Sequence, residues 1–465
     1  MKRGVLLLVI YLSFFTMCEA QYSILHNFNG NDGEEPEGSL TLSGDKLFGM
    51  TYYGGPTSIG NAFSVDTDGN NYKDLFDFNG TTGAYPTGNV IISRGKLYGM
   101  TSMGGVNSIG NIFSMDSNGN NFKDLHDFSS GFSYPEGGGS LIVSGTVLYG
   151  MANAGGTSDD GFIFSIDTNG GGYNVLFDFD GINGGDPYGD LTLYGNKFYG
   201  TTGYGGIHNC GVVFSIDMNG SNYKTLLNFD TTNGAYPCSY LTLLNGKLFG
   251  MTDKGGIYDN GCIFSIDTNG TIYKDLFDFN GSDGSLPGNS FLTLIGSELY
   301  GTTSNGGIND LGVIFSIDTD GSSFSDIFND FDNINGEAPS GVINCGNTLY
   351  GMAQVGGTNT DGVIFKYKQV GLGIDKLSIE LPAIKVYPNP SNGVFRLAFS
   401  HPELVSGSHI QIDNMLGEEV YNGMLNQVQH DCQINISNQP SGIYFFRVIA
   451  ENGSLIGEGE VIIQK

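Results

Sequence analysis

The sequence predicts an all-β chain: a seven-bladed β-propeller closed by an N-terminal strand and followed by a small β-sandwich. Three observations carry this prediction. A five-residue phrase recurs seven times at intervals of 50 or 51 residues, short apolar segments lie between its copies, and the array begins and ends out of phase. A fixed period of this length indicates one supersecondary unit, copied in tandem, whose apolar face is buried against its neighbours.

The recurring phrase pairs two apolar residues with glycine, as in LFGMT or LYGTT. Its copies centre on Gly49, Gly99, Gly150, Gly200, Gly250, Gly301 and Gly351. A Gly-Gly pair follows each copy, at residues 54–55, 104–105, 155–156, 205–206, 255–256, 306–307 and 356–357. This regularity predicts the architecture but says little about activity.

Four strands are expected in each repeat. The second repeat has a short apolar run at residues 89–93, then the phrase, then a run at residues 111–116. Each repeat ends in a segment of the YKDLFDF type, which residues 72–78 form in the first repeat. Runs rich in Ile, Val, Phe and Tyr between Gly, Asn and Asp are typical of strands. The D-x-[DN]-G sequence at residues 66–69 predicts a tight hairpin before the fourth strand.

The two ends of the array predict a closed ring. Residues 22–28 match the fourth strand of a repeat, and the last repeat stops at residues 362–368 without that strand. A linear solenoid would gain nothing from this phase. In a ring, the N-terminal strand completes the last blade and fastens the circle, which removes exposed strand edges.

The order of the strands assigns the loops to two faces. If the run before the phrase is innermost, the crossings between blades, such as residues 79–88, share a face with the Gly-Gly loops. The tight hairpins then lie on the other face. We expect function on the first face, because longer and more variable loops carry most binding residues.

Charge and the N-terminus point to a protein outside the cell. The formal net charge is −29, with 19 Lys and Arg residues, so neither nucleic acid nor an anionic membrane is an expected partner. Residues 1–20 have a basic start, an apolar stretch and a small final residue, which predicts a signal peptide cleaved before Gln21. Cys18 would suit a lipoprotein signal, but Met17 stands where that signal requires Gly or Ala. We expect a monomer that is secreted or attached to the outer cell surface.

The cysteines do not suggest a metal site. Five remain after cleavage: Cys210, Cys238, Cys262, Cys345 and Cys432. Their spacing matches no metal-binding pattern. Cys210 and Cys262 fall near equivalent positions of adjacent blades, so a disulfide and two buried free thiols are both open interpretations.

The composition changes after the repeats. We assign residues 21–368 to the propeller, 369–383 to a linker and 384–465 to a domain of alternating short strands that fits a small β-sandwich. Its motifs are a Y-P-N-P phrase, a later D-x-x-x-G stretch and a P-S-G-I-Y phrase. Their key residues are Tyr387, Pro388, Asn389, Pro390, Gly393, Gly417, Gly442 and Tyr444, with Lys465 at the end.

On these motifs, residues 384–465 resemble the type A sorting domain of the type IX secretion system of Bacteroidota. The resemblance implies an Ig-like fold, the secretion machinery as a partner, passage through the outer membrane and removal of the domain. The rest of the chain would then be attached to the surface or released. A fibronectin-like binding module is the competing interpretation.

Residues 47–365 resemble the GloVer repeat. The matching pattern is L-Y-G-[MT]-[TA], then G-G, then G-x-[IV]-F, as at residues 299–301, 306–307 and 312–315. The family occurs on bacterial proteins with varying surface anchors, and it implies no established activity.

No catalytic residue is singled out by the repeats. His26 and His126 occupy the slot of Phe76 and Phe277, which predicts packed strand residues. His208 lies beside Cys210, but one His and one Cys without spaced partners do not make a metal site.

The Asp residues that recur once per blade fit hairpin capping. Examples are Asp66, Asp116 and Asp217; the D-x-[DN]-G spacing is too short for an EF-hand loop. Calcium at the crossings, which are rich in Asp and Asn, stays open, and no other cofactor is expected. A carboxylate pair for glycoside hydrolysis also stays open.

The residues that vary on the predicted functional face are the candidate ligand-binding residues. They are Tyr52, Tyr53, Tyr85, Tyr134, Tyr204, Tyr236, Asp253 and Lys254. Tyr rings offer an apolar face and a polar tip that suit sugars or peptides, although they could simply pack loop to loop.

Two functions remain. The uniform repeats favour a non-catalytic binding module for glycan or protein. A carbohydrate-active enzyme, a hydrolase or lyase, would require titratable groups with shifted pKa values that converge on one mouth of the disc.

Overall fold

The computed structural model describes residues 21–129, 139–369, 384–398, 409–414, 419–424, 431–449 and 455–465. The predicted signal peptide and residues 370–383 of the predicted linker lie outside the described residues. The chain divides into two compact units, Met1–Gln369 and Val370–Lys465, and each is presented by itself. None of the helices in the described ranges has the length and apolar character needed to span a bilayer.

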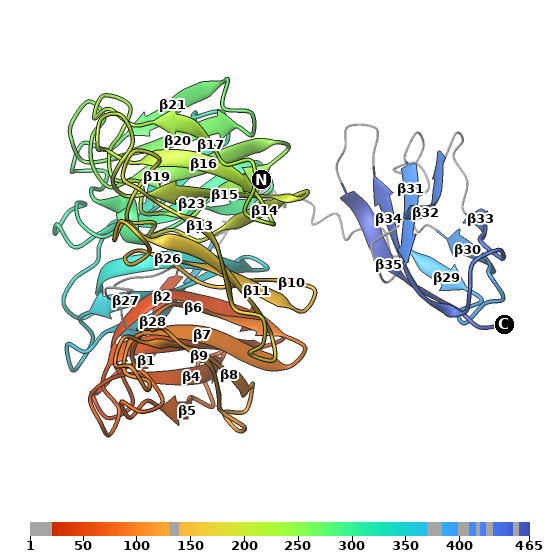
Figure 1. Cartoon of the computed structure of the whole chain (residues 1–465), viewed down its shortest axis with the longest axis horizontal. Coiled ribbons are helices and arrows are strands. Elements are labelled where there is room, and N and C mark those ends of the chain that lie inside the picture. Colours follow the sequence, from red (N-terminus) through yellow and green to blue (C-terminus); the bar gives the residue numbers. More distant parts are fainter. Residues whose placement is uncertain are drawn as a thin grey trace, which may run out of the picture. The chain divides into compact units, whose positions relative to one another are not determined.

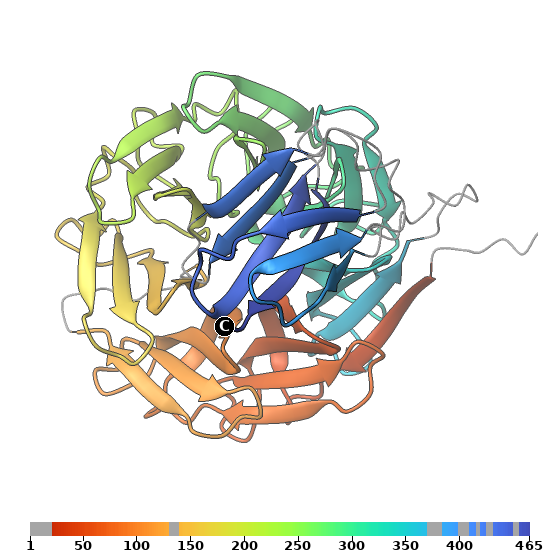
Figure 2. The ribbon, with the colours of Figure 1, turned by 90° about the vertical axis from the view of Figure 1, so that its right-hand side faces the viewer.

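The first unit is a ring of four-stranded antiparallel sheets (Figures 1 and 2). Three sheets contain β2 (Glu34–Ser43), β3 (Lys46–Tyr53), β4 (Asn61–Asp66) and β5 (Lys73–Asp77); β6 (Ala84–Ser93), β7 (Lys96–Met103), β8 (Asn111–Asp116) and β9 (Lys123–Asp127); and β10 (Ile142–Ser144), β11 (Val147–Ala152), β12 (Phe162–Asp167) and β13 (Asn174–Asp178).

Three further sheets repeat this order. They contain β14 (Thr192–Tyr194), β15 (Lys197–Thr202), β16 (Val212–Asp217) and β17 (Lys224–Asn228); β18 (Thr242–Leu244), β19 (Lys247–Thr252), β20 (Cys262–Asp267) and β21 (Tyr273–Asp278); and β22 (Thr293–Ile295), β23 (Glu298–Thr303), β24 (Val313–Asp318) and β25 (Ser325–Phe328). A short 3₁₀ helix, η1 (Pro287–Asn289), precedes β22.

The last sheet closes the ring. It has the order β1-β28-β27-β26, in which β1 (Gln21–Asn27) pairs with β28 (Val363–Lys368), followed by β27 (Thr348–Val355) and β26 (Glu337–Cys345). The Tyr22 hydroxyl donates to the carbonyl of Asn335 at 2.5 Å, as Tyr72 donates to Asp32 at 2.6 Å within the first blade. β1 therefore takes the place of the fourth strand, and the structure is the closed all-β propeller that the sequence predicts.

The glycine of the recurring phrase makes room for a phenylalanine ring. Gly200 pairs across the sheet with Phe214, and a Cβ added at Gly200 would lie 2.6 Å from that ring's Cζ. The other pairs are Gly49–Phe63, Gly99–Phe113, Gly150–Phe164, Gly250–Phe264, Gly301–Phe315 and Gly351–Phe365. Each blade thus buries one ring flat against its own second strand, which explains why the phrase is retained.

Gly200→Ala is expected to lower the free energy of unfolding by about 1–3 kcal/mol, because the new methyl group overpacks the Phe214 ring. Urea unfolding of the mature chain measures this. Gly171→Ala, in an exposed hairpin where only side-chain oxygens lie near the added Cβ, should change stability by less than about 0.5 kcal/mol. Equal effects of the two variants would contradict the packing role of the phrase glycine.

The core of the propeller lies between neighbouring blades. In one cluster, Met251 and Ile263 from one sheet pack with Phe279 and with Phe315 of the next, all fully buried. The same arrangement recurs around the ring. No blade encloses a core of its own, as expected for tandem repeats.

The second unit consists of two sheets. One contains β29 (Lys385–Tyr387), β30 (Val394–Ala398) and β33 (Asp431–Asn435), and the other contains β32 (Glu419–Met424), β31 (His409–Asn414), β34 (Gly442–Ile449) and β35 (Leu455–Ile463). Phe395 and Ile434 of the first sheet share a buried core with Ile412 and Phe446 of the second. Two antiparallel sheets around one core form a β-sandwich.

Candidate functional site

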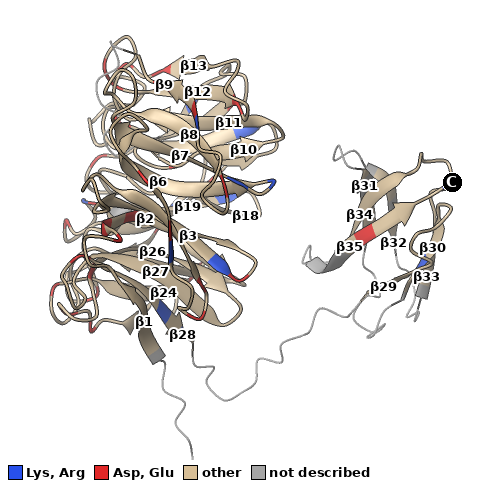
Figure 3. Ribbon diagram, turned by 90° about the horizontal axis from the view of Figure 1, so that it is seen from below, with Lys and Arg blue, Asp and Glu red and all other residues tan. Residues whose placement is uncertain are grey.

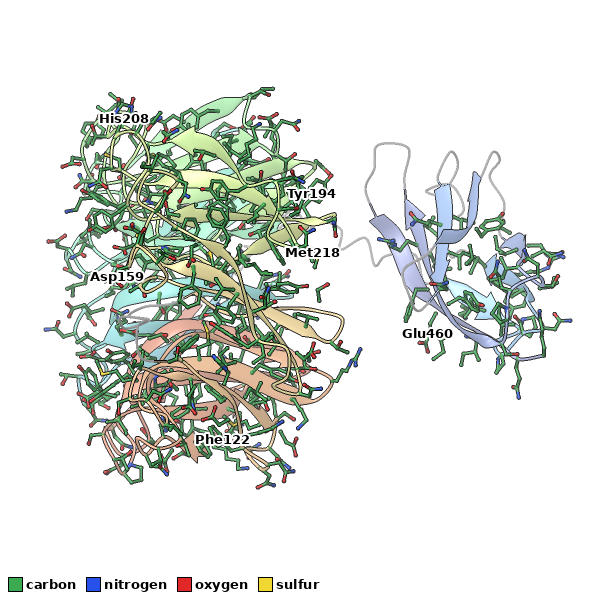
Figure 4. All side chains as sticks on the ribbon, in the orientation of Figure 1. Phe122, Asp159, Tyr194, His208, Met218 and Glu460 are labelled. Carbon is green, nitrogen blue, oxygen red and sulfur yellow. The ribbon has the colours of Figure 1, made fainter. Side chains whose placement is uncertain are left out.

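The propeller has two distinct faces. Asp159 and His208, on Gly-Gly loops, lie at one edge of the disc, whereas Tyr194 and Met218, at tight hairpins, lie at the opposite edge (Figure 4). We call these the loop face and the hairpin face. The blade crossings share the loop face because each fourth strand ends where the Gly-Gly loops lie.

An axial cavity of about 470 Å³ lies where the blades meet. All seven blades contribute lining residues, from the loop-face ends of their inner strands or the segments just before them, and Tyr52 and Gln354 come from second strands. One equivalent position of the repeat, which we call the slot, lines the cavity in six blades. Its residues are Ser39, Asn89, Ser140, Asp190, Tyr240 and Phe291. The residue before this slot is Gly in four blades and Ser in three. At Gly38 an added Cβ would lie 2.4 Å from the carbonyl oxygen of Gly88 on the next inner strand. Close approach of the inner strands thus turns the larger side chains of the slot toward the axis.

The cavity has an aromatic wall and a polar wall. The rings of Tyr240 and Phe291 stack with centroids 4.3 Å apart and planes 20° apart. On the blade next to that of Tyr240, the side-chain oxygen of Asp190 accepts a hydrogen bond from the backbone N–H of Ser140. The side-chain oxygen of Asn89 accepts the equivalent hydrogen bond from the N–H of Ser39 in the preceding blade. Asp190 and Asn89 therefore both connect adjacent inner strands.

The carboxyl groups of the cavity are held partly protonated. Burial raises the pKa of Glu37 to about 7, and the nearby charge of Glu35 adds to the shift. Burial also raises the pKa of Asp190 to about 6, against the hydrogen bonds from Ser140. Near pH 7 Glu37 is therefore about half protonated, whereas Asp190 stays mostly ionised.

The other titratable groups at the cavity are neutral near pH 7. Burial, with the charges of Asp253 and Asp186, raises the pKa of the Cys238 thiol to about 12. Burial and then Asp190 raise the pKa of the Tyr240 hydroxyl well above its ordinary value. Cys238 is therefore a poor nucleophile, since the reactive species is the thiolate.

Three of the predicted site residues, Tyr52, Tyr53 and Tyr85, lie at the edge of the cavity. Tyr52 lines it, together with Tyr188 and Gln354. Tyr52 also contacts Tyr53 and Tyr85, with ring centroids 4.8 and 5.1 Å away. The structure thus joins these three Tyr residues into one cluster beside the axial cavity.

The second group lies farther around the loop face. The rings of Tyr204 and Tyr236 lie 4.9 Å apart, and the Lys254 amine lies 5.9 Å from the centre of the Tyr236 ring. Asp253 accepts a hydrogen bond from the N–H of Gly288 at 3.2 Å, and burial raises its pKa. None of these four residues lines the cavity, although Gly288, the partner of Asp253, does. Tyr134 lies outside the described residues.

Sequence reasoning missed the residues that line the cavity most deeply. These residues lie at or just before the start of the inner-strand run, where the residue type changes from blade to blade. They are Glu37, Asp190, Tyr240 and Phe291. That variation within a regular frame was the available signal. The predicted candidates lay instead before the Gly-Gly pairs and on the blade crossings.

The two strand histidines pack like the phenylalanines of their slot. His26 stacks on Tyr72 at 3.8 Å and His126 stacks on Tyr173 at 3.7 Å, as Phe76 stacks on Phe122 at 4.3 Å in another blade. The sequence prediction of packed strand residues agrees with these contacts. Neither histidine lines the axial cavity.

His126→Phe is expected to make the protein less sensitive to acid. Burial lowers the pKa of His126 in the folded protein, so protonation favours the unfolded chain, whose His pKa is about 6.5. The wild type therefore loses stability as the pH falls from about 6.5 through the folded pKa, and the variant does not lose this contribution. The melting-temperature advantage of the variant should be larger at pH 5 than at pH 8. A constant advantage for His126→Phe across this pH range would contradict the account.

The hairpin Asp residues hold side chains of their own blade. Asp66 accepts from the Lys46 amine at 2.5 Å and from the Asn71 amide at 2.6 Å. Within the described ranges, no three His, Cys, Asp or Glu side chains are grouped to hold a metal ion. Cys210 and Cys262 are both free thiols, which decides between the two interpretations of this pair.

The predicted sorting residues tie the start of the second unit to its end. The side chain of Asn389 accepts from the N–H of Ile462 at 2.8 Å, and the Tyr444 hydroxyl donates to the carbonyl of Pro440 at 2.9 Å. The N–H of Lys465 donates to the Ser441 hydroxyl at 3.1 Å. Gly393 has φ +97°, and Gly417 lies outside the described residues.

Comparison with family models gives two matches. The Gloeobacter/Verrucomicrobia repeat matches residues 11–214 and 195–378, and the secretion system C-terminal sorting domain matches residues 385–464. No curated protein matches the chain.

Solved structures share the fold. A puromycin-hydrolyzing peptidase from Mycobacterium tuberculosis has a TM-score of 0.50 and 12% identity, covering 80% of this chain and 58% of that one. The extracellular domain of a putative hybrid two component system from B. thetaiotaomicron has a TM-score of 0.52 and 14% identity, covering 83% of this chain and 45% of that one. The chain thus spans about half the length of these proteins. At such identities they indicate a common fold alone.

Proposed function

Because the chain belongs to the Gloeobacter/Verrucomicrobia repeat family and ends in a type IX sorting domain, we propose that it is an exported, surface-attached module that binds a neutral glycan in its axial cavity without turning it over. The secretion machinery is the partner that the sorting domain implies. That domain supports export to the outer surface or beyond it, whereas surface attachment and the ligand are proposals.

One observation carries the proposal: the cavity combines a stacked aromatic wall with small polar side chains and has no Lys, Arg or His in its described lining. Sugar rings stack their C–H faces on aromatic rings such as Tyr240, and their hydroxyls bond to groups such as Ser39 and Asn89. A uronate or sulfated sugar would meet Glu37 and Asp190 without a compensating cation. Neutral glycans therefore fit best.

The enzyme hypothesis has a specific observation in its favour. Glu37 and Asp190 both line the cavity with raised pKa values, a pattern found at catalytic sites. However, Asp190 makes the strand-to-strand bond that the amide of Asn89 makes in another blade, so its role needs no carboxyl chemistry. Glu37 is then left without the second carboxylate that glycoside hydrolysis requires.

A glycan array with the mature chain, followed by calorimetry on the best ligand, tests the proposal. Neutral glycans should bind and uronate or sulfated glycans should not. Asp190→Asn should retain binding within about threefold, since the amide can accept the same hydrogen bond. Release of products by the wild type, lost in Asp190→Asn or Glu37→Gln, would favour the enzyme. Absence of binding to every glycan would refute the proposal.

A further inference from the structure

Most exposed apolar side chains of the loop face lie on one sector, with Tyr53 and Val106 outside it. Those of the sector are Ile182, Tyr204, Ile207, Ile257, Tyr258, Ile308 and Ile334, exposed by 42 to 82%. We call them the apolar arc. They lie on the Gly-Gly loops and crossings of three consecutive sheets, those of β14–β17, β18–β21 and β22–β25, and on the crossing that follows. Single exposed apolar residues are ordinary, but a concentration on one face marks an interaction surface.

The loops that carry the arc are held in place by hydrogen bonds. The N–H of Ile257 donates to Asp278 at 2.9 Å, and the N–H of Gly255 donates to Asp259 at 3.0 Å across the loop. The N–H of Ile207 likewise donates to Asn228 at 2.9 Å. The backbone is therefore fixed while the side chain points outward, so docking onto it would cost little conformational entropy.

Folding does not require isoleucine at these positions. Ile207, Ile257 and Ile308 occupy the slot directly after the Gly-Gly pair. In two other blades the same slot holds Thr157 and Thr358. A polar residue satisfies the loop equally well, so the three isoleucines serve no evident structural purpose in the isolated chain.

The surroundings of the arc are acidic. Asp230, Asp259, Asp283 and Asp310 lie on the same loops and crossings, whose acidic residues appear in Figure 3. Across the described Gly-Gly loops and crossings, Lys254 is the single Lys or Arg residue. Charge complementarity therefore selects a positively charged partner and opposes an acidic one.

The hairpin face of a second copy is a poor candidate for that partner. Two of its lysines are bonded within their own chain, Lys197 to Asp217 at 2.5 Å and Lys224 to the carbonyl of Asn269 at 2.7 Å. Arg94 and Lys247 are exposed on that face, but the formal net charge of −29 opposes contact between two copies. Charge therefore favours a different protein as the source of the positive surface.

We propose that the apolar arc docks a basic protein surface in which aliphatic side chains lie between Lys and Arg residues. The isoleucines would enter the partner's apolar contacts, and the surrounding aspartates would meet its cations. This surface is separate from the glycan site, since no residue of the arc lines the axial cavity.

Three probe peptides of 14 residues test the proposal with the mature chain by biolayer interferometry. One contains Leu and Lys, the second has Ser in place of Leu, and the third has Glu in place of Lys. The Leu–Lys peptide should bind at least about 10-fold tighter than the Ser–Lys peptide, and the Leu–Glu peptide should not bind. Equal binding of the first two peptides would reduce the surface to a general polycation binder and overturn the proposal.

Variants locate the binding. The triple variant Ile207→Thr, Ile257→Thr and Ile308→Thr should lose about 10-fold or more in affinity for the Leu–Lys peptide, with an unchanged melting temperature. Val106→Thr, at the same slot of a blade outside the arc, should bind like the wild type. An unaffected triple variant, or an equal loss in Val106→Thr, would overturn the proposal. Self-association of the wild type in sedimentation, abolished by the triple variant, would overturn it in favour of a second copy.

Discussion

Deletion of residues 21–28 from the mature chain is expected to lower the free energy of unfolding by about 5 kcal/mol or more. β1 is the fourth strand of the last blade, and Phe28 is fully buried against Phe63 and Ile364. Loss of a buried Phe side chain alone costs about 3–5 kcal/mol, and Tyr22 and Ile24 are lost with it. The outer edge of β28 would also lose its pairing strand.

Denaturant unfolding and hydrogen exchange measure this effect. Exchange should accelerate first in β28, whose outer edge the deletion exposes. A synthetic peptide of residues 21–28, added in trans, should restore part of the lost stability, and a scrambled peptide should not. A deletion variant as stable as the full mature chain would show that β1 does not fasten the ring.

Gln354→Trp is expected to weaken glycan binding by about 100-fold, equivalent to about 2.7 kcal/mol. Gln354 lines the axial cavity, and an indole there would fill a large part of its 470 Å³. Calorimetry with the array's best ligand gives the affinities. Ser304→Trp places the same ring in the equivalent slot of another blade, which does not line the cavity, and should leave binding unchanged. Unaltered binding by Gln354→Trp would place the ligand elsewhere.

The architecture was predictable because it repeats. Seven copies of one phrase constrain the strands around it, and the phase of residues 22–28 against residues 362–368 allows a single closure. The reason for the phrase was not predictable: it lies in the distance between Gly200 and the ring of Phe214 on the next strand.

The site was predicted only at its edge. Tyr52 lines the axial cavity, and Tyr53 and Tyr85 pack beside it, because the strand order alone sets which loops share a face. Asp190 and Tyr240 were missed. Their direction depends on how closely seven inner strands approach the axis, and this distance is a property of the closed ring rather than of any one repeat.

The exposure of the isoleucines could not be predicted from the sequence. Ile207, Ile257 and Ile308 were part of the sequence pattern, but an apolar residue next to a Gly-Gly pair can be buried or exposed. Only the fixed loop backbone decides between the two. Among the positions that depart from the repeat, the sequence alone therefore does not distinguish core residues from surface residues.

A crystal structure of the mature chain with its best glycan ligand tests the central claim most directly. We predict an intact sugar in the axial cavity, with one ring stacked on Tyr240 and hydroxyls bonded to Ser39 or Asn89. A sugar bound elsewhere on the propeller, or a cleaved product beside Glu37, would contradict the assignment of this cavity as a non-catalytic glycan site.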